Sequence, residues 1–239
     1  MSATLVHIPY SPWSRRVRLA LRRMGVSVDL KLYTPTLSEP WLRWRLKRWR
    51  GRLSVPVLLR DDGPPLTDSF DIVCWGSDQS DAPLAPAHLR DGLREWNARA
   101  EAALSAGRQL TTLEVLEDDV ALRASLPPPM KRLGPLGSLI GRDACWRLLE
   151  KYGDGRTPPA WDEDLRCYVA DLDERLEAGD HLLGEPSYAD LLAATGLAFV
   201  RPDERSRVPQ EALHCWTRHE LVKAHPRVFA WQERVLREG

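Results

Sequence analysis

The sequence of 239 residues has no apolar run approaching the roughly 20 residues that cross a bilayer. It also lacks an N-terminal cationic stretch followed by an apolar core, so we see no secretion signal and expect a cytoplasmic protein without a membrane partner. Cysteine is scarce: four are present, without a CxxC pair or clustered histidines, at 74, 145, 167 and 215. A disulfide scaffold is therefore excluded, a zinc site or redox dithiol is unsupported, and we expect no metal.

The six histidines form no candidate catalytic triad, and His214 and His219 are five positions apart. The chain also lacks net charge, because 34 Lys and Arg balance 34 Asp and Glu. Residues 1–80 carry 13 basic and 7 acidic side chains, a net of +6, which leaves −6 for the rest. A basic first third could attract an anionic ligand, or could simply be a solvated face. Overall neutrality argues against a nucleic-acid partner.

The first 76 residues alternate strand and helix patterns in the order β-α-β-α-β-β-α. Strands are predicted at 4–8, 26–32, 54–59 and 66–67, and helices at 12–24, 40–50 and 70–75. A strand, a helix and a parallel strand in succession predict a right-handed crossover. On the helix over 40–50, we expect Leu42, Leu46 and Trp49 to share one face.

Residues 76–86 are polar and contain proline, which is typical of a linker. Everything after them is predicted to be helical, as one long or bent helix over 88–124, then further helices near 141–152, 157–178, 191–200 and the C-terminus. We therefore predict two domains, 1–80 and 87–239, the first mixed α/β and the second all-α.

Ser11 lies where a strand ends and a helix begins, followed by Pro12 at the first helical position. Exposed N–H groups and the helix dipole favour an anion there. A hydroxyl at this point can donate to a bound thiolate and so lower the thiol pKa. The simpler interpretation is a helix cap alone. Ser14 and Tyr10 are the second and third candidate hydroxyls.

Two later residue pairs can also be interpreted either as ligand-binding residues or as purely structural ones. If the Val55–Pro56 bond is cis, the backbone of Val55 is turned outward and can pair with a peptide-like ligand, although most such bonds are trans. Asp68 and Ser69 begin a helix, where the carboxylate can take an ammonium group and the hydroxyl a carboxylate. A plain cap explains the second pair equally well.

Together these segments resemble the glutathione transferase family. The resemblance is carried by residues 11–21 (Ser-Pro-Trp-Ser-x-Arg-Val-Arg-x-Ala-Leu), by Val-Pro-Val-Leu at 55–58 and by Leu-x-Asp-Ser at 66–69. Ser-x-Ala-Asp at 187–190 resembles the family's internal capping box, and the ending at 225–231 is also similar. The resemblance implies a thioredoxin-like N-terminal domain and an all-helical C-terminal domain.

The resemblance also implies roles for single residues. Ser11 would activate the glutathione thiol, as in the serine-type (tau, zeta, theta, phi-like) classes, and no cysteine stands nearby for disulfide exchange. Val55 beside a cis Pro56 would bind the cysteinyl backbone, and Asp68 and Ser69 the γ-glutamyl end. Ser54 stands where the family often has a longer polar residue, so the glycine carboxylate falls to Arg52, or else to Arg50 or Lys47. Trp13, Trp96, Arg99 and Ala103 would line the pocket for an electrophile, with Trp13 also beside glutathione.

The resemblance thus implies a cytoplasmic, homodimeric glutathione transferase acting on an electrophilic small molecule, with glutathione as co-substrate. Two alternatives stay open: a zeta-like isomerase that uses glutathione as a cofactor, and a non-catalytic binding protein on the same fold. Residues 41–52 contain six cations, three tryptophans and no acid. They could form a solvated helix, contact an anionic small ligand, or bind a nucleic acid or protein.

Overall fold

The computed structural model describes residues 3–35, 37–203 and 206–237. The described chain divides into two compact units. Unit 1 takes in residues 3–97, 181–195 and 235–237, and unit 2 takes in 98–180 and 196–234. No described helix combines the length and the apolarity that a membrane span requires. The two units are defined by contacts, whereas the predicted domains, 1–80 and 87–239, are segments expected to fold separately. That division stays a prediction.

The sheet of unit 1 has three strands in the order β2-β1-β3. They are β1 (Ala3–His7), β2 (Asp29–Leu32) and β3 (Val57–Arg60). β1 pairs parallel to β2 and antiparallel to β3, with Val6 opposite Val57. The predicted strand–helix–parallel strand unit is therefore confirmed. Leu66 forms an isolated bridge to Leu58, which confirms the short hairpin partner.

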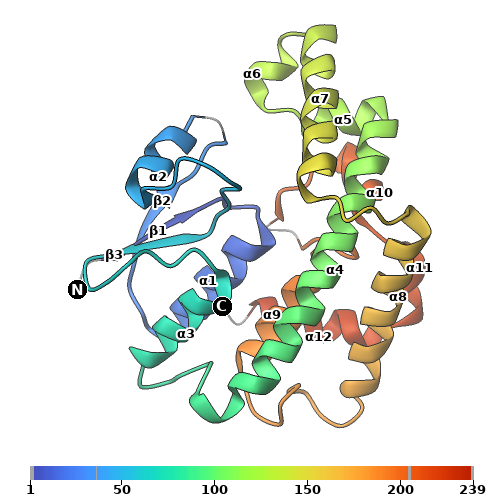
Figure 1. Cartoon of the computed structure of the whole chain (residues 1–239). Coiled ribbons are helices and arrows are strands. Elements are labelled where there is room, and N and C mark those ends of the chain that lie inside the picture. The colour runs from blue at the N-terminus through green and yellow to red at the C-terminus, as the bar shows by residue number, and fades with distance from the viewer. Residues whose placement is uncertain (1–2, 36, 204–205, 238–239) are drawn as a thin grey trace. The chain divides into compact units, whose positions relative to one another are not determined.

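The pleat of this sheet sends alternate side chains to opposite faces. One face carries Val6, Val57 and Leu59, which pack with Leu42 of α2 (Glu39–Leu46) and with Leu53. On the other side of the sheet lie α1 (Pro12–Arg23) and α3 (Ser69–Asp78), as Figure 1 shows. Helices thus cover both faces of a small mixed sheet, which is the predicted thioredoxin-like arrangement.

Helix α1 follows the sequence pattern closely. Its inner face buries Val17, Ala20 and Leu21, and Gly25 ends it with a φ of +69°. Gly76 of α3 lies against this face, where an added Cβ would approach Leu21 Cδ2 to 2.5 Å. Glycine at 76 therefore allows α3 to pack closely on α1.

Helix α2 is shorter than predicted. It ends at Leu46, because Lys47 adopts the left-handed conformation with a φ of 52°. The Arg43 guanidinium then donates to the carbonyl oxygens of Arg48 and Gly51, which fixes the irregular segment that follows. Leu42 is fully buried, but Trp49 is 66% exposed. The expectation that Trp49 shares a helix face with Leu42 and Leu46 is wrong, since the helix ends before Trp49.

The predicted long or bent helix over 88–124 consists of two helices. α4 (Arg90–Glu117) is followed by α5 (Asp119–Ser125), and Asp118 caps α5 by accepting from the N–H groups of Val120 and Ala121. The other helices are α6 (Pro128–Lys131), α7 (Pro135–Tyr152), α8 (Pro158–Arg175), α9 (Tyr188–Gly196), α10 (Leu213–Trp216), α11 (His219–Ala224) and α12 (Pro226–Arg237). Short 3₁₀ turns occupy Ala87–Leu89, Leu197–Phe199 and Gln210–Ala212. The mainly helical character expected after residue 87 is confirmed.

Half of the predicted capping box at the start of α9 is present, because among the described residues the Ser187 hydroxyl oxygen has no hydrogen-bond partner. The buried Asp190 carboxylate accepts from the N–H of Ser187 at 3.1 Å and from that of Leu182 at 3.0 Å. This segment belongs to unit 1, where Tyr188 donates its N–H to the carbonyl of Leu84 at 2.7 Å and its ring lies 6.2 Å from that of Phe70. Unit 1 is therefore completed by residues from late in the sequence.

Candidate functional site

Sheet register brings three chain segments of unit 1 to one end of the sheet. β1 and β3 are antiparallel with Val6 opposite Val57, so the residues after β1 and those before β3 meet at this end. Leu66 pairs antiparallel with Leu58, and the chain from Leu66 therefore runs towards the same end before α3 begins. The candidate residues Ser11, Val55 and Asp68 stand on these three segments.

A hydrogen bond joins the starts of the two helices at this end. The Arg16 Nη2 group of α1 donates to Ser69 Oγ of α3 at 2.6 Å, and the Arg16 side chain is fully buried. Sequence reasoning did not find this pair. The only sequence feature that pointed to it is the position of Arg16 beside Trp13, Val17 and Ala20, which form one apolar helix face. Because Ser69 Oγ accepts from Arg16, a carboxylate bound to Ser69 would share that guanidinium's positive field.

Ser11 caps α1 with an extended backbone, φ −71° and ψ 126°. Its Oγ accepts from the N–H of Ser14 at a long 3.5 Å. The cap uses an oxygen lone pair, so the hydroxyl hydrogen stays available to donate to a ligand. Ser11 is half-buried at the positive end of a helix of 12 residues, where a thiolate would be stabilised.

The other two candidate hydroxyls are placed differently. Ser14 is fully buried and its Oγ accepts from the N–H of Ile8 at 3.2 Å. Together with the bond from Arg18 Nη2 to the Pro9 carbonyl at 3.0 Å, this contact holds the loop that leads to Ser11. Tyr10 is 59% exposed. Ser14 therefore positions the loop, and Ser11 presents the hydroxyl best placed at the helix end.

The Val55–Pro56 peptide bond is cis, as the resemblance implies. Pro56 is buried and Val55 is half-buried. Within the part of the chain that the structure describes, neither the N–H nor the carbonyl of Val55 makes a hydrogen bond. Both groups can therefore pair with the backbone of a peptide-like ligand.

Asp68 caps α3 with one carboxylate oxygen. Its Oδ1 accepts from the N–H groups of Phe70 at 2.8 Å and Asp71 at 3.3 Å. The side chain is exposed, so Oδ2 can accept from a ligand ammonium group without loss of the cap. The cap role and the binding role predicted for Asp68 are compatible.

The other residues predicted for the site differ in exposure and in contacts. Arg52 and Ser54 are exposed on the segment between α2 and β3, and among the described residues the Arg52 guanidinium has no hydrogen bond or ion pair. Of the residues predicted for the electrophile pocket, Trp96 and Ala103 are buried, and Arg99 forms an ion pair with Asp171. Trp13 is half-buried in the first turn of α1.

The four cysteines do not supply a ready thiolate. Burial raises the pKa of Cys74 and Cys145, and a hydrogen bond to Glu163 raises that of Cys167. Burial, with the nearby carboxylates of Glu114 and Asp118, raises the pKa of Cys215 to about 11. A reactive thiolate at neutral pH would therefore have to come from a ligand.

Comparison with known proteins agrees with this geometry. Residues 10–79 match the model of the glutathione S-transferase N-terminal domain. This segment belongs to the glutathione S-transferase family. The matched residues contain the caps of α1 and α3 and the cis peptide bond, so this end of the sheet lies within the family's N-terminal domain. No curated protein matches the sequence.

Solved structures extend the likeness to the fold of the whole chain. A glutathione S-transferase from Methylobacillus flagellatus KT with bound GSH is 18% identical, with a TM-score of 0.62 over 99% of this chain and 98% of that one. One from Methylobacterium radiotolerans JCM 2831, in complex with glutathione sulfonate, is 20% identical, with a TM-score of 0.59 over 98% and 90%. A Pseudomonas fluorescens Pf-5 family member with bound S-(propanoic acid)-glutathione is 20% identical, with a TM-score of 0.58 over 98% and 94%. The chain has the glutathione transferase fold.

Proposed function

We propose that this chain is a glutathione transferase in which Ser11 stabilises the glutathione thiolate. The observation that carries the proposal is the free hydroxyl hydrogen of Ser11 at the N-terminus of α1, on the same end of the sheet as the unpaired backbone of Val55. A hydroxyl donor and a helix dipole both favour the thiolate over the thiol. The Methylobacillus flagellatus, Methylobacterium radiotolerans and Pseudomonas fluorescens neighbours, whose structures hold glutathione or its derivatives, support the choice of ligand.

In this mechanism the thiol first gives its proton to solvent. The thiolate sulfur then donates an electron pair to an electrophilic carbon, and a C–S bond forms. In a substitution the leaving group departs with its bonding electrons, and in an addition the neighbouring carbon takes up a proton. The Ser11 hydroxyl donates to the sulfur throughout the approach and is not consumed.

The rest of glutathione is assigned by matching charges. The N–H and carbonyl of Val55 pair with the cysteinyl backbone, and Asp68 Oδ2 accepts from the γ-glutamyl ammonium group. The γ-glutamyl carboxylate lies at Ser69, where Arg16 adds positive charge. Arg52 takes the glycine carboxylate, and Trp13 contacts the bound tripeptide.

Calorimetric titration with reduced glutathione and with S-hexyl-glutathione tests the assignment. Asp68→Asn retains a good helix cap but loses the charge, and we expect roughly 10-fold weaker binding of both ligands. Asp62→Asn, on the exposed turn after β3, is the matched control and should bind normally. Absence of heat from the unaltered protein would favour the non-catalytic alternative, and equal binding by Asp68→Asn would remove Asp68 from the site.

Product analysis separates transfer from isomerisation. A stable conjugate of glutathione and the electrophile is expected for a transferase. Recovery of free glutathione together with a rearranged substrate would instead identify the zeta-like isomerase.

We also propose that the protein is a cytoplasmic homodimer. The net charges of +6 and −6 on residues 1–80 and 81–239 support an antiparallel pairing, in which the first part of one chain faces the second part of another. Sedimentation equilibrium should show a dimer that weakens as salt is raised. A monomer at all concentrations and salts would contradict this pairing.

A further inference from the structure

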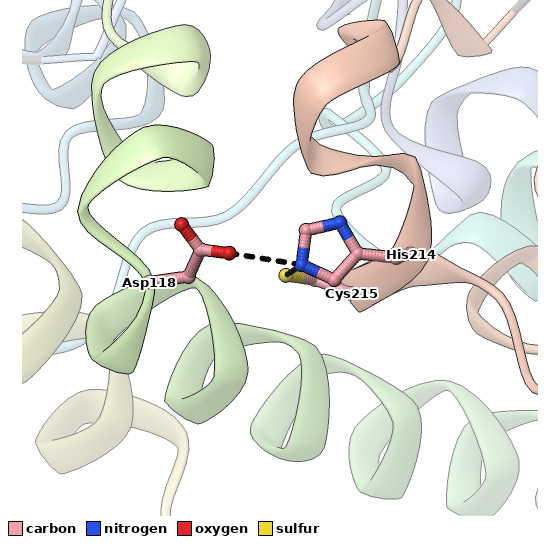
Figure 2. Close-up of side chains that lie close together, drawn as sticks. All are labelled: Asp118, His214 and Cys215. Atoms are coloured by element: carbon pink, nitrogen blue, oxygen red, sulfur yellow. Dashed lines mark hydrogen bonds and ion pairs between the residues drawn. The ribbon is translucent and has the colours of Figure 1, made fainter.

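Three side chains of metal-binding type converge in unit 2. Asp118 stands between α4 and α5, and His214 and Cys215 are neighbours in α10 (Figure 2). His214 Nε2 lies 3.0 Å from Asp118 Oδ2 and 3.3 Å from Cys215 Sγ. All three atoms lie within 4.8 Å of one another.

These separations suit a tetrahedral ion. Zinc binds nitrogen and oxygen at about 2.0–2.2 Å and sulfur at about 2.3 Å, so neighbouring ligand atoms in a tetrahedron are roughly 3.3–3.7 Å apart. The two measured contacts fall within a few tenths of an ångström of that range.

Hydrogen bonding within the protein cannot satisfy this arrangement fully. One ring nitrogen carries either a hydrogen or a lone pair, so His214 Nε2 can donate to Asp118 or accept from the Cys215 thiol, but not both. A cation placed among the three atoms would receive a lone pair from each. The convergence is therefore better explained by a shared ion than by either hydrogen bond alone.

The surroundings orient the ligands. The second oxygen of Asp118, Oδ1, is held by the N–H groups of Val120 and Ala121, which aims Oδ2 at His214. Cys215 is buried, whereas the His214 side chain is 58% exposed and leaves a route for an ion and a water molecule. The site thus has a fixed inner side and an open outer side.

We propose that Asp118, His214 and Cys215 bind one zinc ion, with water as the fourth ligand. On binding, the Cys215 thiol releases its proton to solvent and the thiolate forms a Zn–S bond. The ion would link the start of α5 to α10 inside unit 2. The expectation from sequence was no metal, because the aspartate lies 96 residues before the histidine and no zinc spacing is visible.

Cobalt(II) titration of the purified full chain, stripped of metal with EDTA, tests the proposal. Co²⁺ bound by a thiolate gives an intense sulfur-to-metal charge-transfer band, and we expect it to saturate at one ion per chain and to disappear when Zn²⁺ is added. Cys215→Ser should abolish the band. His214→Gln and Asp118→Asn should weaken binding at least as much as the roughly 10–100-fold caused by loss of an outer hydrogen bond at metal sites.

Matched controls use groups of the same kind outside the cluster. Cys167→Ser removes an exposed thiol and His219→Gln an exposed imidazole, and both should retain the band. Asp118→Asn keeps a residue that caps α5 well, so circular dichroism should show a folded protein even if Cys215→Ser does not fold. The proposal is overturned if the unaltered protein gives no charge-transfer band, if Cys215→Ser retains it, or if folded Asp118→Asn binds as tightly as the unaltered chain. None of these readouts depends on glutathione binding.

Discussion

At Ser11, the helix cap and the proposed chemistry use different parts of one hydroxyl. The oxygen accepts from Ser14 N–H, and the hydrogen is free for a thiolate. A substitution can therefore separate the two roles, because glycine caps a helix at a cost of only a few tenths of a kcal/mol but has no hydroxyl.

We predict that Ser11→Gly folds normally and loses roughly 10–100-fold in conjugation rate at pH 7, the equivalent of a charge-assisted hydrogen bond of about 1.5–3 kcal/mol. Ser11→Thr keeps the hydroxyl and should retain most of the activity. The measurement is the pH dependence of the rate with an activated aryl halide. An unchanged rate for Ser11→Gly would assign the hydroxyl to capping alone.

His7 gives unit 1 a pH-dependent stability. It is buried at the end of β1, and burial followed by the charge of Arg18 lowers the pKa of its imidazole below the ordinary 6.5. The folded state therefore prefers the neutral ring. As the pH falls below 6.5, the unfolded chain takes up a proton that the folded chain excludes, and stability falls until the folded pKa is reached.

We predict that His7→Gln, which cannot be protonated, flattens the fall in stability between pH 7.5 and 5.5. Urea unfolding at several pH values measures this slope, whatever the variant's absolute stability. His219→Gln, an exposed histidine on α11, is the control and should leave the slope unchanged. Equal slopes for His7→Gln and the unaltered protein would show that His7 does not contribute.

Among the elements, α9 depends on one carboxylate at its start. Asp190 accepts from two buried N–H groups, those of Leu182 and Ser187. Asp190→Ala leaves both without a partner, at about 1–3 kcal/mol each, so we predict a loss of roughly 2–5 kcal/mol in the free energy of unfolding. Asp91→Ala, at the exposed start of α4, should change it by less than about 0.5 kcal/mol. Chemical denaturation compares the two, and similar losses would remove Asp190 from its structural role.

Helix α4 contains a glycine that packing requires. An added Cβ at Gly107 would lie 2.4 Å from Phe199 Cβ, an atom fixed close to its own backbone. Helix propensity alone would make Gly107→Ala stabilising by about 1 kcal/mol. We predict instead a net loss of about 1–3 kcal/mol, because overpacking outweighs propensity.

Thermal unfolding measures the effect of Gly107→Ala. Ala102→Gly, at an exposed position of the same helix, calibrates the propensity difference and should cost about 1 kcal/mol. A higher melting temperature for Gly107→Ala would show that Phe199 moves aside without cost.

The sequence predicts the ends of a helix well where neighbouring residues determine them, and poorly where distant contacts do. The start of α1 at Ser11-Pro12 and its end at Gly25 depend on caps and on backbone conformation, and both were predicted correctly. The early end of α2 at Leu46 was not predicted, because the Arg43 guanidinium holds the following segment through the carbonyl groups of Arg48 and Gly51.

The candidate site shows the same division. The caps at Ser11 and Asp68 are local, and their patterns were visible in the sequence. The bond between Arg16 and Ser69 spans 53 residues, and the cluster of Asp118 with His214 spans 96. Only tertiary packing brings residues so far apart in the chain into contact, and such contacts cannot be identified from a single sequence.

For the whole molecule, the composition of unit 1 leads to a prediction about fragments. Residues 181–195 belong to this unit, and Tyr188 bonds to Leu84 and packs on Phe70. A fragment of residues 1–97 has the whole sheet but not this segment, so we predict marginal stability and exposed apolar surface. Urea unfolding and binding of a hydrophobic dye measure both, and a fragment as stable as the full chain would contradict the prediction and support independent folding of the first domain.

Because residues 181–195 are synthesised late, unit 1 cannot complete its folding until most of the chain has been made. A ribosome releases the sheet of unit 1 early, but the segment that covers Phe70 and Leu84 emerges only after most of unit 2 has been made. Until then the nascent sheet offers an apolar surface to chaperones and proteases. A chain truncated before residue 181 would keep that surface, so we expect quality control to remove such products rather than leave a free N-terminal half.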